Sequence, residues 1–198
     1  MQFIVPGLVM MAVITNSFSN VISSFFSAKF QRNLEELLVS PTPEWIIIAG
    51  YVTGGVIRGL VVGAIVLGIS LLFTQIVIHS AAVIVLFIIL TAVLFSLAGL
   101  LNAIYAKSFD GISIIPTFVL TPLTYLGGVF YSIKVLPAFW HSISQANPIL
   151  YMVNGFRYGF LGISDVSIFS SFSVILVFIL ILLGINLYLF KRGYGLRS

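Results

Sequence analysis

Long runs without a charged residue constrain this chain more than any other feature. Five such runs reach the roughly 20 residues that a helix needs to cross about 30 Å of hydrocarbon. They cover residues 1–28, 45–73, 81–106, 111–132 and 166–190, and the second is interrupted only by Arg58. The sequence therefore predicts an all-α integral membrane protein, a polytopic bundle of five transmembrane helices in a single domain over residues 1–198.

The composition excludes several classes of protein. Only 7% of the residues are charged, against about 25% in soluble domains. The chain has no cysteine, and the isolated His79 and His141 are more typical of a membrane interface than of a metal site. It contains neither a GxxxxGK[ST] phosphate loop nor a GxSxG nucleophile motif. We therefore expect no catalytic residue, cofactor or metal in this chain, and the scattered basic residues form no patch for nucleic acid.

The positions of lysine and arginine predict the orientation of the chain in the membrane. Six of them follow the first, third and fifth runs, on one side: Lys29, Arg32, Lys107, Lys191, Arg192 and Arg197. The opposite loops carry only Lys134 and Arg157. Because short cytoplasmic loops retain basic residues, we expect the C-terminus in the cytoplasm and the N-terminus outside. An N-terminus outside suggests that an upstream span is missing.

The first run carries a polar stripe. Its members recur at four-residue spacing or lie beside it: Thr15, Ser19, Ser23 and Ser27, with Asn16, Asn20 and Ser24. Such side chains in a membrane helix face other protein or water, so the stripe indicates either helix packing or a lined translocation path. We name Asn16 and Asn20 as candidate path or gating residues.

Arg58 lies about 21 Å beyond Glu44 along the second run, deep in the hydrocarbon. An arginine at that depth costs about 3 kcal/mol on insertion scales, so it is a candidate path or gating residue as well. The alternative is pairing with carbonyl groups or snorkelling. Gly55, Gly59 and Gly63 recur at four-residue spacing in the same run and predict close helix packing.

Residues 29–44, KFQRNLEELLVSPTPE, predict a short amphipathic helix on the cytoplasmic side, with Arg32, Glu35 and Glu36 on its polar face. The helix could lie on the bilayer surface, but adjacent glutamates are poor ligands for anionic head groups and favour a protein partner. Residues 133–165 lie on the extracytoplasmic side. They contain an apolar run after Pro148 that carries Arg157 and is too short to span, which suits a re-entrant or interfacial helix.

Two motifs, the EELL segment at residues 35–38 and NP-x-x-Y-x-x-x-G-F-R at residues 147–157, resemble the type-2 ABC transporter permeases, and the resemblance runs along essentially all 198 residues. It implies six transmembrane helices per permease in the bacterial inner membrane, a permease homodimer, and separate cytoplasmic ATP-binding subunits that drive export by alternating access. In that picture residues 29–40 form the coupling helix that contacts the ATPase, through Arg32, Glu35 and Glu36. Residues 137–162, with Pro148, Tyr151 and Arg157, form re-entrant helices.

The chain departs from the family at its start, because the N-terminal amphipathic helix and the first span of the family are absent. Two alternatives remain besides the exporter. An ion-coupled secondary transporter or channel would need buried acids and often an inverted repeat, and the sequence has neither. A non-transporting assembly subunit is the other. Nothing in the sequence selects among the drugs, polysaccharides and lipid-linked glycans that the family moves.

Overall fold

The computed structural model describes residues 3–74, 78–133, 137–193 and 195, leaving out the side chains of Glu35, Leu38 and Ala138. Within this part the chain forms helices and no strands, which confirms the predicted all-α fold. The elements are α1 (Ile4–Phe30), α2 (Asn33–Val39), α3 (Glu44–Leu71), α4 (Ala81–Tyr105), α5 (Phe109–Ile115), the π-helix η1 (Pro116–Leu120), α6 (Thr121–Leu126), α7 (Ala138–Gln145), α8 (Pro148–Leu161) and α9 (Ile168–Arg192).

Five helices among the described residues are long and apolar enough to span a membrane: α1, α3, α4, α9 and the continuous segment α5–η1–α6. The fourth ends at Leu126 instead of continuing to residue 132. It ends there because Gly128 adopts a left-handed backbone conformation with a φ of +72°. Gly127 packs so close to Ile149 in α8 that an added Cβ would lie 2.6 Å from its Cγ2. The last six residues of the predicted span therefore form a turn against α8.

The two prolines of the fourth span are accommodated by a π-helix and by a neighbouring side chain. Pro116 has no N–H to donate to the carbonyl of Ile112, and Nδ2 of Asn102 in α4 reaches that oxygen in a long hydrogen bond of 3.5 Å. The hydroxyl of Thr121 donates to the carbonyl of Pro116 at 3.0 Å, and the backbone N–H of Thr121 donates to the same oxygen. The carbonyl freed by Pro116 thus finds a donor inside the protein.

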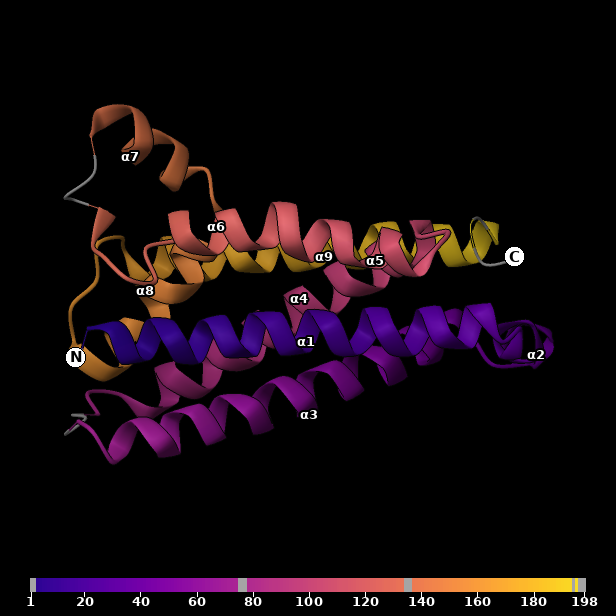
Figure 1. The fold of residues 1–198 in the computed structure, drawn as a ribbon, viewed down its shortest axis with the longest axis horizontal. Helices are drawn as coiled ribbons and strands as arrows, with labels where there is room; N and C mark the ends of the chain where they lie inside the picture. Colours follow the sequence, from indigo (N-terminus) through magenta and orange to yellow (C-terminus); the bar gives the residue numbers. More distant parts are fainter. Residues whose placement is uncertain (1–2, 75–77, 134–136, 194, 196–198) are drawn as a thin grey trace.

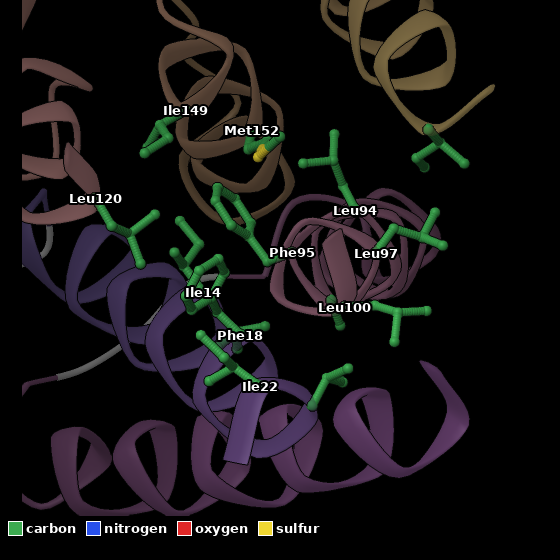
Figure 2. Packing of buried hydrophobic residues seen from close by; sticks show 14 of the residues in the cluster. Ile14, Phe18, Ile22, Leu94, Phe95, Leu97, Leu100, Leu120, Ile149 and Met152 are labelled. Carbon is green, nitrogen blue, oxygen red and sulfur yellow. The ribbon is translucent and has the colours of Figure 1, made fainter. Parts of the chain in front are cut away.

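The core lies where α1 and α4 meet. α1 packs against both α3 and α4, and α4 also contacts α8 and α9. Figure 2 shows the side chains that fill this space: Ile14, Phe18 and Ile22 of α1, Leu94, Phe95, Leu97 and Leu100 of α4, with Leu120, Ile149 and Met152 around them. α1 is therefore the central helix of the bundle, and its polar groups are placed by these contacts.

The bundle has two distinct ends. Figure 1 shows α2 and the C-terminal end of α9 at one end, and the N-terminus with α7 at the other. Loops that the sequence predicts on one side of the membrane therefore lie at the same end of the molecule. We refer to the end with α2 as the α2 end.

Candidate functional site

The α2 end of the bundle carries most of the described basic residues. Lys29, Arg32, Lys107, Lys191 and Arg192 belong to the elements that meet there. Arg157 lies toward the other end, in α8, while Lys134 and Arg197 are outside the described residues. The charge asymmetry expected from the sequence is therefore also an asymmetry between the two ends of the folded chain.

α2 is a seven-residue helix set off from α1 by a sharp change of direction. Arg32 adopts a left-handed backbone conformation with a φ of +62°, so α1 ends at Phe30 and a new helix starts at Asn33. The helix predicted over residues 29–44 is thus shorter, and Arg32 lies in the turn before it. Left-handed conformations are uncommon for residues with a Cβ. No pattern in the sequence predicts the left-handed conformation of Arg32.

The side chains of α2 divide into an anchor and an exposed face. Leu34 is fully buried, while Glu36, Leu37 and Val39 are exposed, Val39 to 87%. The side chain of Glu35, the third predicted coupling residue, lies outside the described part. α2 therefore presents the carboxylate of Glu36 and the apolar side chain of Val39 to its surroundings, and such mixed surfaces suit contact with another protein.

The base of α2 is tied to the neighbouring helices. Nζ of Lys29 donates to the carbonyls of Ile104 at 2.9 Å and Ala106 at 3.1 Å, at the C-terminal end of α4. A cation there satisfies carbonyls that have no partner within their own helix. The rings of Phe30 and Phe109 make an edge-to-face contact, with their centroids 5.2 Å apart. This contact joins the end of α1 to the start of α5. These contacts fix the end of α1, from which α2 follows after two residues, to α4 and α5.

The predicted glycine ridge lies in the contact between α1 and α3. Gly55, Gly59 and Gly63 are buried. A Cβ on Gly55 would overlap Val21 of α1 and Ser96 of α4, and a Cβ on Gly59 would overlap Ser17 of α1. A Cβ on Gly63 would lie 2.6 Å from Cγ2 of Val13. Sequence reasoning missed the α1 residues that face the ridge. Their only signal was the four-residue spacing of Val13, Ser17 and Val21.

Asn20 and Arg58 come together between the same two helices. Nη1 of Arg58 donates to Oδ1 of Asn20 at 3.3 Å, and the arginine side chain is exposed on the surface of the chain. Asn16 does not take part, because its side-chain amide donates to the carbonyl of Ala12, one turn back in α1, at 2.9 Å. Of the three candidate path residues, the structure thus joins two.

A cavity of about 450 Å³ adjoins this pair on its α2 side. Asn20 and Ser24 of α1, Leu37 of α2, and Gly50, Tyr51 and Gly54 of α3 are among the residues that line it. Thr15 of the polar stripe lines a smaller pocket of about 160 Å³ against η1 and α6, whereas other members of the stripe bond within α1. The hydroxyl of Ser23, for example, donates to the carbonyl of Ser19 at 2.7 Å.

The region before α9 contains two helices at the end away from α2. α7 and α8 are joined through Tyr151, whose hydroxyl donates to the carbonyl of Gln145 at 2.7 Å. Pro148 is the first residue of α8, where the absence of an N–H costs nothing. Asn147 caps the helix by accepting from the N–H of Ile149 at 3.0 Å and donates to the carbonyl of Leu123 in α6 at 2.6 Å.

Arg157 holds α8 against the turn that follows α6. Its side chain is 2% exposed, Nη2 donates to the carbonyl of Gly128 at 2.7 Å, and the guanidinium lies 3.7 Å from the ring centre of Phe3. Burial lowers the pKa of Arg157 to about 10, and Asp165 acts in the opposite direction, so the group stays protonated at neutral pH. Asn154, which sequence reasoning missed, is buried beside it and accepts from the N–H of Asp165 at 3.1 Å.

Comparison with known proteins shows which family the chain belongs to. A model of the ABC-2 type transporter family matches residues 1–161. The chain belongs to this family. It is also similar to the inner membrane transport permease YadH of Escherichia coli (strain K12), with 63% identity over 198 residues that cover 100% of this chain and 77% of the relative. YadH of Escherichia coli O157:H7 and YadH of Shigella flexneri match with the same identity and coverage.

The predicted resemblance to the type-2 ABC permeases is therefore confirmed. The part that matches the ABC-2 family extends from the start of α1 to the end of α8, so it contains α2, the Asn20–Arg58 pair, the glycine ridge and Arg157. Among the described residues, no group of three His, Asp or Glu side chains is arranged to hold a metal ion.

Proposed function

We propose that this chain is a membrane-spanning permease subunit of an ATP-driven exporter in the bacterial inner membrane. It uses a separate ATP-binding subunit that docks on α2, and it works as a homodimer with alternating access between the two copies. The family match and the names of the relatives, inner membrane transport permeases, support this proposal. Five helices long and apolar enough to span the membrane agree with it.

The observation that carries the proposal is the exposed face of α2 at the basic end of the bundle. Basic residues are retained in short cytoplasmic loops, so this end is the cytoplasmic one and the C-terminus lies inside. Glu36 and Val39 are then accessible to a soluble subunit from the cytoplasm. The contacts of Lys29 with the end of α4 connect this face to the spans.

The positions of the acids favour an ATP-driven permease over an ion-coupled transporter. Glu35 and Glu36 belong to α2, Glu44 begins α3, Asp110 lies in the first turn of α5, and Asp165 lies between α8 and α9. None of the five acids in the sequence is at the middle of a span. Proton or cation coupling generally relies on carboxylates at that depth.

A charge reversal on α2 tests the proposal. Changing Glu35→Lys and Glu36→Lys together adds positive charge to a cytoplasmic segment and should leave insertion intact. If these carboxylates face the ATP-binding subunit, its association with the permease and the stimulation of its ATP hydrolysis both fall. Asp110→Lys is the matched control, because it reverses an exposed acid at the same end outside α2.

Co-purification of the ATP-binding subunit and its ATP turnover are compared among the parent, the double variant and the control. The proposal predicts a loss only in the double variant. If the double variant binds and stimulates the ATP-binding subunit like the parent, α2 is a membrane-surface helix and the proposed docking site is wrong.

A further inference from the structure

Arg58 is a charged group on the outer surface of α3, halfway along a helix of 28 residues. Among the described residues its guanidinium donates only to Asn20, in a hydrogen bond of 3.3 Å. A guanidinium carries five N–H groups, so most of its hydrogen-bonding capacity is unused. A cation facing hydrocarbon at this depth is costly, and intramembrane arginines face water, protein or a bound ligand instead.

A second copy of this chain cannot supply the missing anion. All five acids lie at helix ends or in connecting segments, and none is near the middle of a span where Arg58 sits. Pairing two copies along this surface would bring the two arginines no carboxylate. The electrostatic partner of Arg58 is therefore more readily supplied by a ligand than by a dimer contact.

The cavity beside Arg58 has the size and lining of a ligand site. Its volume of about 450 Å³ lies within the range of small-molecule pockets. Gly54 is one helical turn from Arg58, and Asn20, which accepts the hydrogen bond of the arginine, also lines the cavity. Ile46, Ile47 and Leu37 give it apolar walls. The cavity is thus an open apolar groove, and Arg58, which does not line it, lies one helical turn beyond Gly54 and contacts Asn20 at its edge.

We propose that the cavity between α1, α2 and α3 binds an amphipathic anion, whose acidic group is held by Arg58 and Asn20 and whose apolar body lies between Tyr51 and Leu37. This inference rests on the proposed permease function, since it names the class of molecule that the permease accepts from the cytoplasmic side. Leu37 belongs to α2, so a molecule in the cavity contacts both the spans and the proposed docking helix. Occupancy of the cavity would therefore be communicated to the ATP-binding subunit.

A glycine in the wall of the cavity provides the test. Gly50 lines the cavity, and a Cβ added there meets no atom within 4 Å, so the side chain of Gly50→Leu starts in open space and takes up volume beside the cavity wall. Gly68→Leu is the matched control, because Gly68 lies on the same helix with the same free space but outside the cavity. Replacing glycine within a helix does not weaken the helix. Both variants are therefore expected to fold.

The probe is dodecyl phosphate with a photoreactive group in its alkyl chain. It is added to the 198-residue chain in phosphatidylcholine nanodiscs without any ATP-binding subunit. We expect labelling on residues 37 and 46–51, at least about tenfold weaker in Gly50→Leu and unchanged in Gly68→Leu. Arg58→Gln should weaken labelling about tenfold, whereas Arg58→Lys, which keeps the charge, should retain part of it. Unlabelled dodecyl phosphate should compete, and dodecanol and inorganic phosphate should not.

Equal labelling of Gly50→Leu and Gly68→Leu would overturn the assignment of the cavity. Labelling unaffected by Arg58→Gln, or competed equally by dodecanol, would overturn the requirement for an anion. Competition by inorganic phosphate alone would show that the site takes free phosphate and not an amphiphile. Since no ATP-binding subunit is present, these results are independent of the charge-reversal experiment on α2, which tests the proposed function.

Discussion

At Gly99 the backbones of α1 and α4 lie so close together that there is no room for a larger side chain. A Cβ on Gly99 would lie 2.6 Å from the carbonyl oxygen of Phe18 and 3.3 Å from its carbonyl carbon, and real Cβ atoms essentially never come within 3.0 Å of such neighbours. A side chain could rotate away, but these atoms belong to a helical backbone. Gly99→Ala therefore forces the two helices apart over the most buried part of the core.

The size of this effect follows from two opposing contributions. Overpacking a well-packed core costs about 1–3 kcal/mol, and in a membrane the contact between helices depends on close packing. The change from glycine to alanine returns up to about 1 kcal/mol through helix propensity. With the full gain we expect a net loss of up to about 2 kcal/mol for Gly99→Ala. The matched change Gly68→Ala meets no atom within 4 Å and should be neutral or slightly stabilising.

Reversible unfolding in mixed detergent micelles measures both variants. We predict that Gly99→Ala unfolds at a lower fraction of denaturing detergent than the parent, and that Gly68→Ala unfolds at the same or a higher fraction. A Gly99→Ala variant as stable as Gly68→Ala would refute it, because the contact between α1 and α4 would then have room that the structure does not show.

Three further predictions concern the two ends of the bundle. Arg157→Gln removes a charged donor from a buried carbonyl and should lower the free energy of unfolding by about 1.5–3 kcal/mol, measured by the same detergent titration. Lys29→Met should cost about 1 kcal/mol, because the last carbonyls of α4 lose their donor, whereas Lys107→Met at an exposed position should cost nothing measurable. The chain has no cysteine, so a single introduced cysteine can be labelled specifically. Phe139→Cys should react with a membrane-impermeant maleimide in spheroplasts, and Lys191→Cys only after the membrane is opened. The reverse order of labelling would invert the proposed orientation.

The number of spanning helices could be predicted from the sequence because it depends on local composition. A run of apolar residues must form a helix in lipid, whatever it later contacts. The end of the fourth span could not be predicted in this way. The residues after Leu126 carry no charge, so a count of apolar residues passes over Gly127 and Gly128. The helix stops at this pair, where Gly128 has a left-handed backbone and Gly127 packs against Ile149, a residue that is distant in the sequence.

The polar residues show the same division between local and tertiary information. Their four-residue spacing places Thr15 and Ser19 on one stripe of α1, but spacing does not say which stripe faces another helix. The buried serine is Ser17, which faces the glycines of α3. Likewise, Arg58 was recognisable as unusual from its depth, whereas its pairing with Asn20 depends on how α1 and α3 cross.

Cross-linking can show whether α2 joins this permease to a separate ATP-binding subunit. Since the chain has no cysteine, Glu36→Cys places a single reactive group on the exposed face of α2. With a short cysteine-to-amine cross-linker in inverted membrane vesicles, we predict a product with a polypeptide that carries a GxxxxGK[ST] loop, and none from Phe139→Cys at the other end. Products with lipid alone, or equal products from both positions, would contradict the account.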